Sequence, residues 1–239
     1  MNRGLHIVPL HGIGEIQRGT DLSEEILAAC HSCGFELQHG DVLVVTQKIV
    51  SKSEGAMEQV DPTNPLSHKP LVERESVRIL RRRGELIISE TKHGFVCANA
   101  GIDLSNVAQG WAALLPEDPD RSARRLRDQL AGRHGLTVGV IISDTFGRPW
   151  RRGVTDVAIG SAGITPILDL RGTEDSYGRE LQVTEVCVVD ELAAAADLVM
   201  GKATGVPVAI IRGVDPTWLE SHGGVLTDVV RSPQDDLFR

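Results

Sequence analysis

The residues of this sequence best suited to chemistry are an aspartate and a threonine near its middle. Asp144 and Thr145 directly follow the apolar, strand-like residues 137–142, and Arg148 and Trp150 come soon after them. A strand that ends in a polar turn delivers polar groups to one edge of a sheet, where ligands tend to bind. A carboxylate beside a hydroxyl suits a hard cation, and the arginines that follow suit phosphate or carboxylate. An isolated Asp-Thr turn is equally typical of a plain strand end, so a second turn of the same kind has to support this interpretation.

That second turn lies upstream and contains Asp103 and Asn106, two oxygen donors at short range that follow apolar, β-branched stretches. Taken alone, Asp-x-Ser-Asn is typical of an Asx-turn or a helix N-cap. Taken with Asp144 and Thr145, it predicts a site for Mg2+ or Mn2+. These ions use few carboxylates and complete their shell with water and substrate phosphates.

The spacing of apolar residues predicts alternating strands and helices, and hence a mixed α/β (α+β) fold with mixed or antiparallel sheets and flanking helices. Residues 147–188 show little helical periodicity and are expected to pair antiparallel. We expect one domain over residues 1–239, with a division into two lobes near 147–188 as the alternative. We expect strands at 5–10, 41–46, 137–142, 164–170, 181–189 and 206–212, and helices near 22–30, 71–80, 119–133 and 190–200.

The composition is that of an ordinary globular protein. The chain has 239 residues, 41% of them hydrophobic and 24% charged, which is enough for one large core or two small lobes. Its formal net charge of −8 argues against a general nucleic-acid partner. No apolar run approaches the roughly 18 residues that span a bilayer, and the N-terminus lacks the apolar block of a signal peptide. We therefore expect a cytoplasmic protein without a membrane partner.

The familiar nucleotide-binding motifs are absent from the sequence. Neither G-x-x-x-x-G-K-[ST] nor G-x-G-x-x-G occurs, so we expect neither a P-loop nor a Rossmann domain. A nucleotide would therefore need a different phosphate-binding segment. The glycine-bearing loop 12–16 offers bare backbone amides, and the segment with Gln47 and Lys52 offers an ammonium group for phosphate oxygens.

Cys30 and Cys33 form a C-x-x-C pair, which can indicate redox or zinc chemistry. The pair lies near the end of an amphipathic helix, and no second Cys/His pair with metal-site spacing accompanies it. We therefore interpret these cysteines as inert thiols.

Blocks of sequence spread over essentially the whole chain, in order, resemble the coenzyme F420 γ-glutamyl ligase family. They lie at 9–15, 41–55, 94–106, 115–120, 142–150, 183–186 and 189–201. The resemblance implies that family's fold and a GTP-dependent ligase that adds L-glutamate to the deazaflavin precursor F420-0 in coenzyme F420 biosynthesis. In the family, the first glutamate joins the lactyl carboxylate through its α-amine and further ones join through γ-carboxyls. The resemblance also implies a homodimer, here in the form without the C-terminal nitroreductase-like domain that some members carry.

The resemblance further implies a set of site residues. Asp103, Asp144 and Thr145 would act in catalysis by holding two divalent ions, Mg2+ or Mn2+, with K+ as a further ion. Lys202 departs from the family pattern, which has an amide ligand to metal at this turn; a charged lysine cannot coordinate metal but can contact phosphate. The GTP site would be lined by Ile13, Gly14, Glu15, Ile16, Gln47, Lys52, Asn106 and Lys202.

The mechanism we expect is phosphorylation of the acceptor carboxylate by GTP, followed by attack of the glutamate amine on the acyl phosphate. Phosphoryl transfer asks mainly for positioning and charge neutralisation. Two alternatives stay open: a related ligase acting on another, folate-type acceptor, and a non-catalytic GTP-binding module. Arg148, Arg151 and Arg152 are candidates for a substrate clamp or for plain solvation, and Trp150 for stacking on the deazaflavin or for packing.

Overall fold

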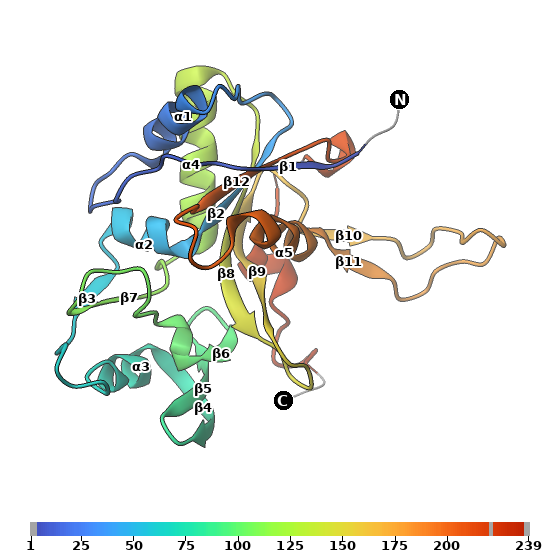
Figure 1. Ribbon diagram of the computed structural model, residues 1–239. Coiled ribbons are helices and arrows are strands. Elements are labelled where there is room, and N and C mark those ends of the chain that lie inside the picture. The colour runs from blue at the N-terminus through green and yellow to red at the C-terminus, as the bar shows by residue number, and fades with distance from the viewer. Residues whose placement is uncertain (1–3, 220–221, 237–239) are drawn as a thin grey trace.

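A five-stranded mixed sheet forms the centre of the computed structural model, which describes residues 4–219 and 222–236 (Figure 1). The order is β1-β12-β2-β8-β9, formed by β1 (His6–Pro9), β12 (Val208–Arg212), β2 (Val42–Thr46), β8 (Gly139–Gly147) and β9 (Val154–Ala162). Strands β2 and β8 run parallel, and the other neighbours in this sheet are antiparallel. The predicted mixed α/β fold, with neither a P-loop nor a Rossmann domain, is confirmed, since those domains need several adjacent parallel strands.

Helices cover both faces of this sheet. Helix α4 (Pro119–His134) packs on β8 and β9, and α5 (Val188–Met200) packs on β1, β12 and β9 from the other side (Figure 1). Helix α1 (Leu22–Ser32) packs against α4. Because the central strands are covered on both faces, β2 and β8 consist of continuous apolar runs, and residues 42–45 and 140–142 are fully buried.

The ends of these helices follow from local sequence. Asp21 caps α1 by accepting a hydrogen bond from Ser23 N at 3.0 Å, and Asp118 caps α4 by accepting from Arg121 N at 2.8 Å. Gly135 ends α4 in the left-handed region, at φ 67°. The helices predicted near 22–30 and 119–133 are therefore confirmed.

Gly160 allows α4 to begin directly against β9. A Cβ atom at this position would lie 2.3 Å from the carbonyl carbon of Pro119, so no other residue fits without displacing the helix. Nearby, the buried carboxylate of Asp120 accepts from the amides of Ser161, Val225 and Leu226 at 2.8–2.9 Å. These bonds fix the C-terminal turn η3 (Val225–Val229) to the start of α4.

A smaller hydrophobic cluster lies beside the main core, around Val72, Ile87 and Ile102. Its elements form the lower left part of Figure 1. They are β3 (Met57–Gln59), α3 (Lys69–Glu75), β4 (Ser76–Arg83), β5 (Leu86–Thr91), β6 (Val96–Ala98), η1 (Asn99–Gly101) and β7 (Trp111–Ala113).

The helix predicted over 71–80 was wrong in its second half. Helix α3 ends at Glu75, and residues 76–83 form β4, which pairs antiparallel with β5. The β-branched Val77 and Ile79 favour a strand, and pairing with β5 outweighs the short helical spacing that predicted a helix. The arginines at 81–83 are therefore exposed strand residues rather than a solvated helix end.

The segment 147–188 supplies β9 to the main sheet and then a two-stranded ribbon of β10 (Ile167–Asp169) and β11 (Glu185–Cys187). The antiparallel pairing predicted here is confirmed, although both ribbon strands are shorter than expected. Between them the chain extends well away from the body of the molecule (Figure 1). The turn η2 (Pro216–Trp218) follows β12. The single domain and the alternative division into lobes near 147–188 stay predictions.

Across residues 4–219 and 222–236, no helix has both the length and the apolar character needed to cross a bilayer.

Candidate functional site

A cleft of about 920 Å³ opens at one edge of the central sheet. Because β2 and β8 are parallel and Thr46 lies opposite Ser143, the polar residues after β2 and those in the second half of β8 meet at the same edge. The prediction of a turn at Asp144 and Thr145 was wrong, because both residues lie within β8 and pair with β9. Strand β1 also ends there, and β9 and β12 begin there. The structure thereby brings every predicted site residue into one cleft, namely Ile13, Gly14, Glu15, Ile16, Gln47, Lys52, Asp103, Asn106, Asp144, Thr145 and Lys202.

Helix α2 (Gln47–Glu54), which follows β2 directly, presents two lysines to the cleft. The Nζ atom of Lys48 lies 2.7 Å from Asp103 Oδ2, and the largely buried Lys52 pairs with the exposed Glu15. Sequence analysis did not assign Lys48 a role. Its spacing of four residues from Lys52, which puts both side chains on one helix face, is the signal that would have indicated it.

Asp103 is both an Asx-turn residue and a cleft residue. Its Oδ1 accepts a hydrogen bond from Ser105 N at 2.7 Å, while Oδ2 faces Lys48. Burial raises the pKa of Asp103, but the bonds from Lys48 and Ser105 outweigh it and leave this pKa below its usual value. The Asp103 carboxylate is therefore charged at neutral pH.

Asp144 has the opposite character, although it lies in the same cleft. Burial, with the nearby carboxylates of Asp103 and Asp156, raises the pKa of Asp144 to about 7 against smaller opposing effects of the Thr145 amide and Lys48. Within the described chain, no lysine or arginine forms an ion pair with it. Asp144 is half-buried. A half-buried carboxylate that opens into a cleft and lacks its own cation is a natural ligand for an added one.

Asp156, on β9, is a cleft residue that sequence analysis missed. It is only 2% exposed and accepts hydrogen bonds from Ser143 Oγ at 3.0 Å and Thr145 Oγ1 at 2.6 Å. Its Oδ1 also lies 2.8 Å from Lys202 Nζ. The register of the β8–β9 pair places Asp156 opposite Thr145, so only the pairing of the strands shows that it belongs to the site.

Two groups in the cleft have free capacity for a ligand. The side chain of Gln47 is buried, its Oε1 accepts from Ser51 Oγ, and its Nε2 has no partner among the described residues. In the loop after β1, the space where a Cβ of Gly14 would lie is open, so the backbone can approach a ligand closely. Both features suit an oxygen-rich ligand.

Asn106 connects two turns of the cleft. Its backbone is left-handed, at φ 51°, and its Nδ2 donates to the carbonyl oxygen of Lys202 at 3.4 Å. The turn that carries Asp103 is therefore joined to the turn that follows α5.

Comparison with known proteins identifies the family. The family model described as F420-0:gamma-glutamyl ligase matches residues 12–213, which contain all of the predicted site residues. This chain belongs to the F420-0:gamma-glutamyl ligase family. It is 44% identical to the coenzyme F420:L-glutamate ligase of Methanothermobacter thermautotrophicus over 99% of both chains, and 44% identical to that of Methanopyrus kandleri over 98% of both. The protein of the same name from Archaeoglobus fulgidus is 38% identical over 98% of this chain and 96% of its own length.

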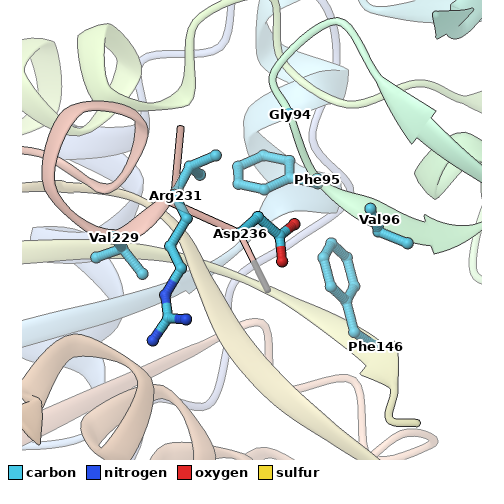
Figure 2. A pocket seen from close by; sticks show the side chains of 8 residues that line it. Gly94, Phe95, Val96, Phe146, Val229, Arg231 and Asp236 are labelled. Carbon is cyan, nitrogen blue, oxygen red and sulfur yellow. The ribbon is translucent and has the colours of Figure 1, made fainter. Parts of the chain in front are cut away.

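This member of the ligase family has another, smaller cavity of about 370 Å³, which Phe146 of β8 helps to line (Figure 2). Phe95 and Phe146 line this cavity, with ring centroids 6.0 Å apart and planes at 69°; Asp236 lies between them in Figure 2, and Arg231 lies farther to the left. Phe146 follows Asp144 by two residues on β8, so both side chains leave the same face of that strand.

The Arg-rich turn after Thr145 lies outside the cleft of this ligase. Trp150 is 95% exposed and Arg148, Arg151 and Arg152 are exposed too, and none of them lines the cleft. Trp150 therefore does not pack into the core of this chain, and the roles of Trp150 and the three arginines stay open.

The four cysteines of this ligase are free thiols. Cys30 is buried, and burial raises its pKa to about 11, so the reactive thiolate is scarce at neutral pH. Within the described residues, no group of three or more His, Cys, Asp or Glu side chains is placed to hold a metal ion on its own. The structure supports the interpretation of Cys30 as an inert thiol, whereas Cys33 is exposed and its inertness stays a prediction.

Proposed function

We propose that this chain is a GTP-dependent ligase that joins the amino group of L-glutamate to the lactyl carboxylate of F420-0, with γ-linked additions afterwards. The observation that carries the proposal is the single cleft that holds a bare backbone loop, Lys52, the free amide of Gln47 and two carboxylates of contrasting pKa. Its curated relatives are named for coenzyme F420 and L-glutamate.

The nucleotide phosphates would lie between the loop 13–16 and α2. The amides of this loop can point at phosphate oxygens, and the free Nε2 of Gln47 adds a donor. Lys52 is 10% exposed and is paired with a Glu15 side chain that is 72% exposed. Glu15 can therefore move into solvent, and a phosphate group can take its place beside the buried ammonium group.

A divalent cation, Mg2+ or Mn2+, would bind beside Asp103 and Asp144, because Asp144 is a half-buried carboxylate without a cationic partner in the described chain. When bound, such an ion neutralises phosphate charge and favours transfer of the γ-phosphoryl group. The number of ions and a further K+ site stay predictions.

The reaction we propose has two steps. A carboxylate oxygen of F420-0 attacks the γ-phosphorus of GTP, and the bond to the β-phosphate oxygen breaks, which releases GDP and leaves an acyl phosphate. The glutamate amine then attacks the acyl carbon, phosphate leaves with the former carboxylate oxygen, and the amine loses a proton. Lys48 and Lys52 hold positive charge near the phosphates in both steps.

The aromatic cavity beside Phe146 offers a surface for the planar deazaflavin ring of the acceptor (Figure 2). Its wall of Phe95 and Phe146 suits stacking, and it adjoins the strand face that carries Asp144. In this arrangement the ring binds away from the phosphates and the lactyl end extends toward the cleft.

Mass spectrometry tests the proposal. F420-0 incubated with L-glutamate, GTP and Mg2+ should gain one glutamyl unit, and omission of glutamate should leave it unchanged. If the lactyl carboxylate carries 18O, one labelled oxygen should appear in the released phosphate, because the acyl phosphate forms through that oxygen. Product without label transfer would contradict the acyl phosphate.

The same assay separates the alternatives. A ligase for a folate-type acceptor would extend that acceptor and leave F420-0 unchanged. A non-catalytic module would bind GTP without glutamate-dependent release of GDP. The homodimer implied by the family and the cytoplasmic location expected from the sequence are also part of this proposal.

A further inference from the structure

The ammonium group of Lys202 is held by oxygens on every donor that it has. Its Nζ lies 2.8 Å from Asp156 Oδ1 and 3.1 Å from Asp197 Oδ1, and it donates to Thr145 Oγ1. A lysine carries three N–H donors, so these three acceptors satisfy it completely. An oxygen-only environment of this kind resembles the ligand shell of a hard cation.

Three different elements fix this arrangement. Asp156 comes from β9, Thr145 from β8 and Asp197 from the last turn of α5, four residues before the turn that carries Lys202 begins at Gly201. Burial lowers the pKa of Lys202, but its bonds with Asp156 and Asp197 outweigh it and raise this pKa above its usual value. The ammonium group of Lys202 therefore stays positively charged at neutral pH, next to the hydroxyl group of Thr145.

In the cleft without a nucleotide, one divalent ion balances the charges of the side chains that line it. The five carboxylates of Glu15, Asp103, Asp144, Asp156 and Asp197 face the three ammonium groups of Lys48, Lys52 and Lys202. When Asp144 is ionised and no nucleotide is bound, two negative charges are left, which one divalent cation neutralises. A second divalent ion would need the oxygens of Thr145 or Asp156, and Lys202 already contacts Thr145 Oγ1 and Asp156 Oδ1, while Ser143 donates to Asp156 Oδ2.

We propose that Lys202 supplies, in this chain, the positive charge that a second divalent ion would otherwise supply, so that the cleft holds one divalent cation, at Asp103 and Asp144. This inference rests on the proposed function only in assuming that metal and guanine nucleotide bind in the cleft. The two-ion expectation for Asp103, Asp144 and Thr145 does not fit the residues around Thr145.

The test is a count of bound Mn2+ by electron paramagnetic resonance, with the full chain in molar excess over GDP so that all nucleotide is bound. The wild-type chain should bind one Mn2+ per GDP-bound cleft and give the spectrum of an isolated ion. In Lys202→Gln the ammonium is lost and an amide oxygen is gained. That variant should bind two Mn2+ and show a spectrum broadened by coupling, because paired ions lie about 4 Å apart.

Lys92→Gln is the matched control. Lys92 is half exposed and pairs with Glu75 outside the cleft, so the same change of residue there should leave the count at one. Thermal unfolding gives a second measurement. Without metal, Lys202→Gln should be less stable than wild type, since Asp156 loses its cation. Added Mn2+ should raise its melting temperature more than that of the wild-type chain.

Two Mn2+ with a coupled spectrum in the wild-type chain would overturn the proposal, and so would a folded Lys202→Gln variant that still binds one. If that variant does not fold, the number of Mn2+ ions bound by the wild-type chain decides on its own whether the proposal holds. No glutamate or F420-0 is needed. A chain that binds one Mn2+ but makes no glutamyl product would therefore contradict the ligase function and leave this inference standing.

Discussion

Two aspartates in one cleft show how the environment of a residue decides its chemistry. Asp103 receives an ammonium group and a backbone amide, so its pKa falls, whereas Asp144 is half-buried near other carboxylates and its pKa rises to about 7. Asp103 is thus a preformed anion, and Asp144 becomes one most readily when a cation binds. We infer that a metal ion binds between the two carboxylates, of which Asp103 is already ionised and Asp144 ionises when the metal binds.

Asp103→Asn and Asp144→Asn should each reduce glutamate addition by about a thousandfold or more at saturating Mg2+, because phosphoryl transfer loses several kcal/mol of charge stabilisation. Both changes keep the side-chain shape, and circular dichroism should show an unchanged fold. Turnover close to that of the wild-type chain in either variant would show that the site is wrongly assigned.

The raised pKa of Asp144 also predicts an effect on stability. The folded state binds this proton more tightly than the unfolded state, whose pKa is near 3.8, so the stability it contributes is present at low pH and is lost as the pH rises to about 7. Asp144→Asn removes the titrating carboxyl group, so the variant does not lose this stability as the pH rises. In metal-free urea unfolding at pH 8, the variant should be more stable by about 1–4 kcal/mol.

The difference in unfolding free energy between Asp144→Asn and the wild-type chain should shrink steadily as the pH falls to 5. A difference that stays constant from pH 5 to 8 would show that Asp144 does not titrate in this range.

Phe146→Ala should raise the KM for F420-0 about tenfold or more and leave the KM for GTP within about twofold, since a stacked aromatic ring contributes about 1–3 kcal/mol. Initial rates with each substrate varied in turn measure both values. An equal effect on both KM values would indicate general damage to the cleft instead of loss of a ring-binding surface.

At the scale of elements, the contact between α4 and β9 positions one side of the cleft. It depends on the absence of a side chain at Gly160, where a Cβ would lie 2.3 Å from Pro119. Strand β9 carries Asp156, so a shift of β9 would move that carboxylate relative to Thr145.

Gly160→Ala should therefore destabilise the fold by about 1–3 kcal/mol, the usual cost of overpacking, and should lower activity as well. Gly132→Ala is the matched control. Gly132 lies within α4, and no atom lies within 4 Å of its Cβ position, so alanine should stabilise the helix by about 0.5–1 kcal/mol. Urea unfolding of both variants measures the contrast, and equal effects would show that the predicted clash relaxes without cost.

At the scale of the whole molecule, the cleft is formed by segments far apart in the chain, from the loop after β1 to the turn after α5. A ligand bound there contacts many elements at once and should stabilise all of them together. The connection between β10 and β11, by contrast, carries exposed side chains such as Tyr177 and Val183 outside the core.

GDP with Mn2+ at about 100 times its dissociation constant should stabilise the fold by about 2.7 kcal/mol and raise the melting temperature by about 5–10 °C. Lys52→Gln should show less than half of this shift at the same concentrations, because the buried ammonium group beside the phosphates is lost. An undiminished shift in differential scanning fluorimetry would place the phosphates elsewhere.

The sequence alone determined the elements with strong local signals, because capping residues, periodicity and buried apolar runs act over a few neighbours. It predicted α1, α4 and the strands β1, β2, β8 and β12, and it indicated the polar turn at Asp103 and the polar residues Asp144 and Thr145, although these two lie within β8. Only the tertiary structure decided that residues 76–83 form a strand, since pairing with β5 is a long-range interaction. The same holds for Asp156, which joins the site through the register of β8 and β9, and for Lys202, whose ammonium group three separate elements surround.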